Sequence, residues 1–212
     1  MHRWRKLGSG TALTAALAMT VGCNWLVPMG VMTAPRTEKV PAEFDKLPGS
    51  KTVILVWAEP DTLFDYPNVR LELNSYIAAQ VKSRLSNVRF VPARDVEDYL
   101  QRSPSSTQDP LAVAQHFTAD KVIHVVLLEF SMRDREMAHF YRGRIRASVT
   151  VYDLKDKSGT PQRYALSDVF VVYPPDRPVG FDAGAATVVR QKTYESFADA
   201  VGRKFYDYER EL

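Results

Sequence analysis

The sequence predicts an α/β fold of the α+β kind, a single compact domain in which helices pack on a mixed sheet of about five strands with a long hairpin. Two β-branched, apolar runs at 52–57 and 121–130 are typical of central strands covered on both faces. Apolar and polar residues alternate over 140–154, which is typical of a strand with one wet face. Segments with helical spacing separate and follow these strands, so the elements form one layered structure.

The first half of the domain, after the strand at 52–57, reads as helices around a second strand. Residues 68–85 have one apolar stripe at four-residue spacing, formed by Val69, Leu73, Ile77, Val81 and Leu85. A strand over 88–91 and a short helix over 94–101 follow. After a polar loop, Asp109 and Pro110 suit the N-cap and first turn of another short helix.

The second half of the domain reads as a long hairpin and a last helix. The strand at 121–130 is followed by 140–154, whose apolar face comprises Ile145, Ala147, Val149 and Val151 and whose polar face comprises Arg144, Arg146, Ser148, Thr150 and Tyr152. Residues 164–173 return as the hairpin partner. Asp182 is expected to cap the last helix, whose apolar residues are Val188, Tyr194, Phe197, Ala198, Val201, Phe205 and Tyr208.

Residues 1–22 have the composition of an export signal. A positive start formed by Arg3, Arg5 and Lys6 precedes a short apolar stretch that ends in the small residue Gly22. This stretch is shorter than the roughly 20 apolar residues that span a bilayer, so a transmembrane helix is not expected.

Cys23, the only cysteine of the chain, directly follows this leader. The ending Val21-Gly22-Cys23 resembles the lipobox of bacterial lipoproteins, although Thr20 stands where that class usually has Leu. The resemblance implies that Cys23 receives the lipid, and Asn24 looks like the residue that lets Gram-negative lipoproteins move to the outer membrane. The alternative is a free or buried cysteine after an apolar run.

Residues 23–50 read as a lipidated cysteine followed by a proline-rich tether, so the globular domain is expected over 51–212. Prolines at near-regular intervals (Pro28, Pro35, Pro41 and Pro48) favour an extended chain. Two alternatives stay open for the apolar part of this segment, since residues 40–44 either belong to the spacer or dock against the domain.

The charge balance argues against a nucleic-acid partner. The chain has 28 basic and 25 acidic residues, and the leader holds three of the basic ones, which leaves 25 against 25 in the remainder. A nearly neutral domain lacks the basic footprint that nucleic acids require.

The sequence shows no catalytic or metal-binding motif, and we expect a protein without enzymatic activity and without a cofactor or metal. His116, His124 and His139 are spread over separate elements without carboxylates or cysteines at metal-ligand spacing. His124 lies inside an apolar strand, so we expect it to be a residue of the core or the sheet and not a metal ligand or a catalytic base. The carboxylates of Asp95, Glu97 and Asp98 are expected to lie on a solvated face of the short helix.

Two surfaces are candidates for partner binding. Arg142, Arg144 and Arg146 alternate along one strand, so they lie on one face, where they could engage phosphate or carboxylate groups; the alternative is a solvent face with cross-strand partners such as Asp168. The second surface is the loop expected at 60–67, with the apolar residues Leu63, Phe64 and Tyr66, which either bind a partner or pack onto the domain.

The body of the chain resembles a group of bacterial envelope lipoproteins, namely the CsgG type of curli secretion, the LpoB type that activates penicillin-binding proteins, and the N-terminal domain of TolB. The likeness is carried by residues 51–56, 119–123 and 148–154. It implies a periplasmic binding or assembly module, an accessory to a secretion, transport or cell-wall machine, held at the outer membrane through Cys23 and contacting an envelope protein or further copies of itself. A polymer-modifying hydrolase and a ring-forming secretion component are the alternatives.

Overall fold

The computed structural model describes residues 37–137, 139–155, 159–180, 182 and 184–211. Residues 39–208 form one compact unit, which is the body described below, and 37–38 with 209–211 belong to a second unit. The predictions for the leader, for Cys23 and for the tether up to residue 36 lie outside the described residues.

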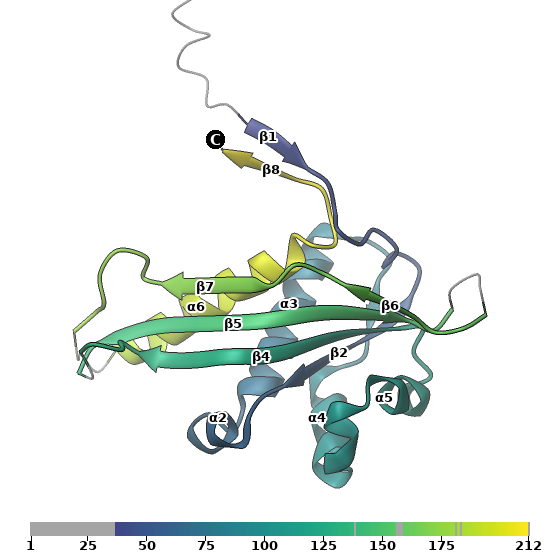
Figure 1. Cartoon of the computed structure of the whole chain (residues 1–212), viewed down its shortest axis with the longest axis horizontal. Coiled ribbons are helices and arrows are strands. Elements are labelled where there is room, and N and C mark those ends of the chain that lie inside the picture. Colours follow the sequence, from purple (N-terminus) through teal and green to yellow (C-terminus); the bar gives the residue numbers. More distant parts are fainter. Residues whose placement is uncertain (1–36, 138, 156–158, 181, 183, 212) are drawn as a thin grey trace, which may run out of the picture. The chain divides into compact units, whose positions relative to one another are not determined.

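The body is built on a mixed six-stranded sheet (Figure 1). Its strands are β2 (Lys51–Trp57), β3 (Arg89–Phe90), β4 (Lys121–Arg133), β5 (Tyr141–Asp153), β6 (Gln162–Ala165) and β7 (Val169–Tyr173). The order is β3-β2-β4-β5-β6, and β7 also pairs with β5; β2 runs parallel to β3 and β4, and the remaining pairs are antiparallel. The predicted α/β class, with its mixed sheet, long hairpin and helices on the sheet, is confirmed.

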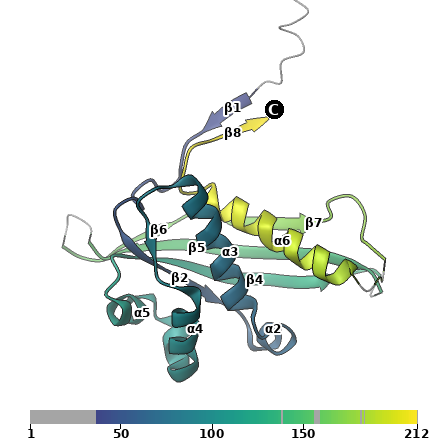
Figure 2. The ribbon, with the colours of Figure 1, turned by 180° about the vertical axis from the view of Figure 1, so that it is seen from behind.

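Helices cover the two faces of this sheet unequally. They are α2 (Pro60–Asp65), α3 (Val69–Arg84), α4 (Ala93–Arg102), the short 3₁₀ helix η1 (Pro104–Gln108), α5 (Pro110–Phe117) and α6 (Ala185–Gly202). The long helices α3 and α6 lie side by side on one face and bury the larger core (Figure 2). On the other face α4 and α5 form a smaller core against β2 and the start of β4.

A register shift in β4 changes which residues face the larger core. Leu127 and Glu129 lie opposite two successive residues of β5, Ala147 and Arg146, so Leu128 is the extra residue of a bulge. Core residues of β4 are therefore odd-numbered before the bulge and even-numbered after it: Ile123, Val125 and Leu127, then Phe130 and Met132. Glu129 is turned to the opposite face as a consequence.

The predicted return strand at 164–173 is divided in two, which raises the main sheet from five strands to six. Ala165 pairs with Thr150, whereas Val169 pairs with Ala147, so three residues of the returning chain span two residues of β5. The extra residue interrupts the ladder between β6 and β7. It leaves Ser167 exposed at the interruption.

The segment before β2 docks against the body, which decides between the two alternatives for residues 40–44. Phe44 and Leu47 are 4% and 0% exposed and belong to the larger core. The Phe44 amide donates to the carbonyl oxygen of Lys204 at 2.9 Å, which ties the segment to the end of α6. The short strands β1 (Thr37–Val40) and β8 (Tyr208–Glu211) pair in a separate two-stranded sheet.

Several local predictions are wrong at the ends of helices. The loop expected at 60–67 contains α2, which begins at Pro60, a residue suited to a first helical turn. The last helix begins after Gly184 instead of being capped by the side chain of Asp182, whose backbone oxygen accepts a hydrogen bond from Ala185. Tyr194, Phe197, Ala198 and Val201 are buried as predicted, but near the start of the helix Val189 is buried and Val188 is 53% exposed.

The predicted wet face of β5 is only partly wet. Ile145, Ala147, Val149 and Val151 are buried as predicted. On the opposite side, however, Thr150 is buried and Tyr152 packs against the core that α4 and α5 form. The wet part of β5 is therefore confined to the half that carries the arginines.

Candidate partner-binding face

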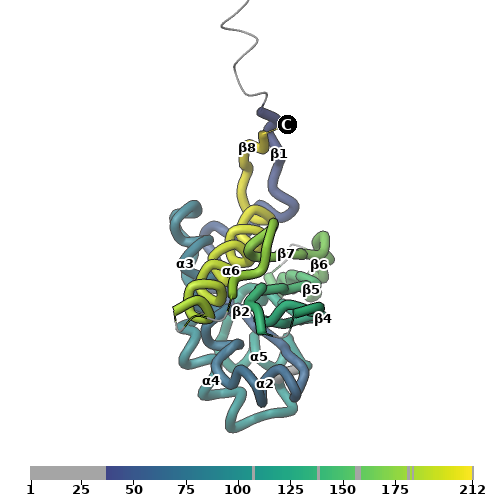
Figure 3. Tube along the Cα trace, turned by 90° about the vertical axis from the view of Figure 1, so that its left-hand side faces the viewer, coloured from purple at the N-terminus to yellow at the C-terminus, as the bar shows by residue number. Residues whose placement is uncertain are grey.

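The sheet face opposite α3 and α6 is open over the second half of β4, the first half of β5 and β7. Figure 3 shows α3 and α6 on one side of these strands and no helix on the other side. Leu128 and Phe170 are 53% and 52% exposed there, and the Arg146 side chain is 51% exposed. We define the open face by six residues, which are Leu128, Glu129, Arg142, Arg144, Arg146 and Phe170.

The strand register gathers arginines around one carboxylate on this face. Opposed residues of paired strands share a face, and the bulge sets Glu129 opposite Arg146. The Glu129 carboxylate lies 3.6 Å from Nε of Arg144, 3.9 Å from Nε of Arg146 and 2.6 Å from Nη2 of Arg135. Glu129, and not Asp168, is therefore the carboxylate that these arginines contact.

Arg142 differs from the other two arginines because it holds the chain that follows β7. Its Nε donates to the carbonyl oxygen of Pro174 at 3.1 Å, and its Nη2 donates to that of Pro175. Asp134 lies 4.0 Å from its Nη1. The structure thus places the three predicted arginines on one strand, but it gives Arg142 a structural role in addition to its charge.

Arg144 and Arg146 retain hydrogen-bonding capacity. Nη1 of Arg144 is buried without a hydrogen-bond partner, although buried donors in proteins are almost always satisfied. The Arg146 guanidinium lies over the ring of Phe170, 4.8 Å from its centroid, which is a cation–π geometry. An exposed arginine stacked on an exposed aromatic ring has the composition of an interface centre.

Glu129, Leu128 and Phe170 were not among the residues predicted for this surface. The signal for Glu129 was present, because it is the only acidic residue in the apolar run 121–130. Its position opposite Arg146 depends on the bulge at Leu128, and a bulge is a property of two paired strands that one strand's sequence does not reveal.

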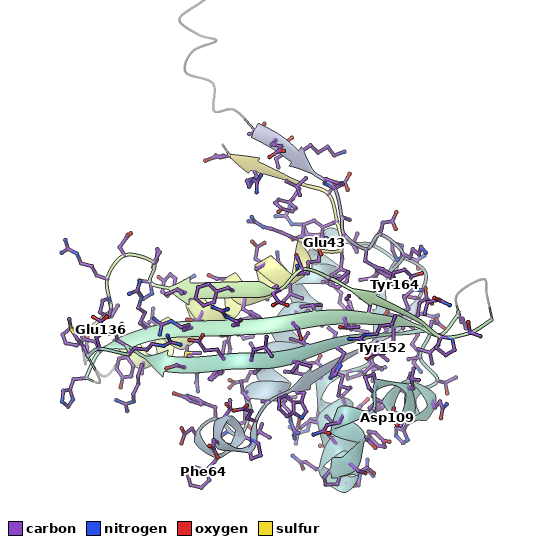
Figure 4. All side chains as sticks on the ribbon, viewed as in Figure 1. Glu43, Phe64, Asp109, Glu136, Tyr152 and Tyr164 are labelled. Carbon is purple, nitrogen blue, oxygen red and sulfur yellow. The ribbon has the colours of Figure 1, made fainter. Side chains whose placement is uncertain are left out.

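The second predicted surface is divided by α2. Leu63 and Tyr66 pack against the core, with the Tyr66 and Phe130 ring centroids 5.0 Å apart in an edge-to-face arrangement. Phe64 is 88% exposed and points away from the body in Figure 4. The three residues therefore do not form one apolar patch.

A hollow of about 330 Å³ lies beside α2, at the carboxyl end of β2. Trp57, Leu63 and Leu100 line it, together with Arg70, whose guanidinium makes two hydrogen bonds to the Glu97 carboxylate at 3.1 and 2.5 Å. The side chains of Arg70 and Glu97 are only 14% and 11% exposed. The prediction of a solvated carboxylate at Glu97 is therefore wrong, because the carboxylate is needed to neutralise a buried guanidinium.

A second hollow, of about 300 Å³, contains Glu43, Ser167 and Lys204. The Lys204 ammonium donates to Oε1 of Glu43 at 3.1 Å and to Oγ of Ser167 at 2.5 Å. Burial alone would raise the pKa of Glu43, but hydrogen bonds from Ser167 and Lys204 outweigh it and hold that pKa below its ordinary value. The cluster fastens three chain segments, because Lys204 donates to both Glu43 and Ser167.

His124 is half-buried in β4, opposite Leu55 and Thr150, as the sequence predicted for a residue within the sheet. Burial, with the positive charge of Arg163 adding to it, lowers the pKa of His124 from 6.5 to about 4. Its Nε2 is buried without a hydrogen-bond partner. The imidazole is therefore neutral at pH 7.

Within the residues that the structure describes, no three histidine, cysteine or carboxylate side chains are grouped so as to hold a metal ion. No helix among those residues has the length and apolar character needed to cross a bilayer.

Comparison with known proteins found no matching protein-family model and no matching curated sequence. Among solved structures, the chain is similar to the PelC dodecamer from Paraburkholderia phytofirmans, with 10% identity and a TM-score of 0.40 over 80% of this chain and 98% of that one. Lipoprotein GNA1162 from Neisseria meningitidis matches at 14% identity and a TM-score of 0.41, over 73% and 99% of the two chains. A minor lipoprotein from Acinetobacter baumannii matches at 14% identity and a TM-score of 0.28, over 75% and 92%.

Proposed function

We propose that the chain is an envelope lipoprotein, anchored through a lipid on Cys23, whose body works by binding a partner of an envelope machine. The body faces the periplasm, and the anchor lies in the outer membrane. The observation that carries the binding role is the open sheet face, where Arg146 and Phe170 are half exposed side by side.

The anchoring part of the proposal rests on the first residues of the sequence. A basic start, a short apolar stretch and the ending Val21-Gly22-Cys23 favour export followed by acylation. Each buried methylene of a lipid chain contributes about 0.8 kcal/mol, and several chains together hold a protein on a bilayer essentially permanently. Asn24 after the cysteine supports the outer membrane as the destination.

The binding part of the proposal rests on the composition and exposure of the open face. Arginine and aromatic residues are enriched where proteins bind one another, and the open face presents both in contact, as Arg146 over Phe170. Leu128 and Phe170 would lose their contact with water on binding, while Arg144 and Arg146 would supply orientation. The face therefore supports contact with another molecule better than it supports a reaction.

Labelled palmitate tests the anchoring part in cells that produce the wild-type chain or a Cys23→Ser variant. We expect the wild-type chain to take up label and to stay with membranes after a carbonate wash, and the variant to do neither. A wild-type chain that takes up no label and is washed off as readily as the variant would contradict the proposal.

A further inference from the structure

We propose that the open face binds an extended acidic segment of a partner protein, with carboxylates at alternate positions and apolar residues beside them. This inference rests on the proposed binding function and adds the chemistry of the partner. The occupant is a peptide chain, and neither a membrane surface nor a phosphate polymer.

The spacing of the arginines fits an extended chain. Arg142, Arg144 and Arg146 are alternate residues of β5 and thus share a face. A strand rises about 3.4 Å per residue, so neighbouring arginines are about 7 Å apart along β5. Alternate side chains of another extended peptide have the same spacing, so carboxylates at alternate positions meet Arg144 and Arg146 in register, whereas Arg142 is engaged by the carbonyl oxygens of Pro174 and Pro175.

The charge of the face is positive after its internal ion pairs are counted. Three of its six residues are the arginines Arg142, Arg144 and Arg146 and one is Glu129, so three positive charges meet one negative charge. Arg135 and Asp134, which lie beside the face, add one charge of each sign. Glu129 is within 4 Å of three guanidinium groups and cannot neutralise all of them. The excess of two positive charges selects an acidic occupant.

The apolar part of the face selects a peptide among acidic molecules. Leu128 and Phe170 are 53% and 52% exposed on the same open face, and Phe170 contacts Arg146. An acidic peptide can cover these two side chains with apolar residues of its own. A phosphate polymer offers no apolar group to them, whereas burial of such area contributes to binding by a peptide.

A synthetic peptide that alternates Glu with Val and carries a fluorescent label tests the inference by fluorescence anisotropy with the full chain in detergent. We expect binding that weakens with salt, and about a tenfold loss of affinity in an Arg146→Glu variant. Arg94→Glu is the matched control, because Arg94 is exposed at the start of α4 and its replacement changes the charge equally. The control should bind like the wild type.

Two further arms identify the occupant. A peptide with Lys in place of Glu should bind the Arg146→Glu variant better than it binds the wild-type chain. Phe170→Ser should lower the affinity for the Glu peptide without changing how that affinity depends on salt. Equal losses in the Arg146 and Arg94 variants would overturn the inference. So would binding to phosphatidylglycerol vesicles that requires Arg146 when the Glu peptide does not bind.

Failure of this inference and failure of the proposed function give different results. If the peptide does not bind but the chain takes up palmitate at Cys23 and is cross-linked to an envelope protein through another surface, the function stands and the open face is not its binding site. If the chain is neither acylated nor cross-linked, the function itself is wrong.

Discussion

Acid should destabilise the folded chain through His124, because the folded state keeps this imidazole neutral. The pKa of His124 is lowered by burial, and to a smaller extent by Arg163, from 6.5 to about 4. The unfolded chain therefore binds a proton on this residue at a higher pH than the folded chain does. The stability that the neutral imidazole allows is fully present above pH 6.5 and is lost as the pH falls from 6.5 towards 4.

The size of this effect follows from the two pKa values. One pKa unit corresponds to about 1.4 kcal/mol, so a drop from 6.5 to about 4 gives a loss of about 3 kcal/mol in the free energy of unfolding across this pH range. Glu43 and Asp120 also contribute to acid sensitivity, but their pKa values lie below the ordinary 4.5 and 3.8. Their contribution is lost at lower pH, which separates it from that of His124.

Urea unfolding at pH 7.5, 6.5, 5.5 and 4.5 measures the effect in the wild-type chain and in a His124→Phe variant. Phe keeps a ring at this site and removes Nε2, which is buried without a partner. We expect the variant to be at least as stable as the wild type at pH 7.5 and to lose far less stability down to pH 4.5. His116→Phe, at an exposed ring stacked on Tyr99, is the control. Parallel pH curves for wild type and His124→Phe would refute the reasoning.

Three other substitutions test the packing of the body, each by urea unfolding. Gly143→Ala places a Cβ 1.8 Å from Oγ1 of Thr193, so it should cost roughly 1–3 kcal/mol. Thr193→Ala in the same chain should restore only part of this loss, because the Cβ that Ala keeps would still lie 2.7 Å away. An undisturbed single variant would show that α6 does not approach β5 so closely. Glu97→Gln leaves the Arg70 guanidinium buried without its carboxylate and should lower the free energy of unfolding by roughly 3–5 kcal/mol. Adding Arg70→Met should recover much of that loss. Equal stability of Glu97→Gln and the wild type would contradict a buried ion pair. Phe64→Ser should change stability by less than about 0.5 kcal/mol because the ring is 88% exposed, and a large loss would mean that it is covered.

Periodicity in the sequence predicted the elements whose pattern is local. The buried run of β2, the apolar stripe of α3 and the alternation in β5 each require only the spacing of residues within one segment. The cap of α5 is local as well, and it is confirmed, since Oδ1 of Asp109 accepts hydrogen bonds from the amides of Leu111 and Ala112 at 3.1 Å.

Features that depend on two distant segments could not be predicted in this way. The bulge at Leu128 and the interruption at Ser167 arise from the pairing of strands, and each turns a side chain to a face that simple alternation would not give it. Position 143 requires glycine because Thr193 of α6 lies so close to β5 that a Cβ there would clash with it. The sequence around either residue does not indicate this contact. The arginine face was therefore visible in the sequence, whereas the carboxylate at its centre was not.

Site-specific photo-cross-linking in intact cells tests the central claim most directly, with the cross-linking residue placed at Phe170 or at Arg94 of the full chain. We expect an adduct with an envelope protein from position 170, loss of this adduct when Arg146→Glu is present, and no such adduct from position 94. Equal adducts from both positions, or an adduct from position 170 that survives Arg146→Glu, would contradict the proposal that the body binds a partner through the open face of its sheet.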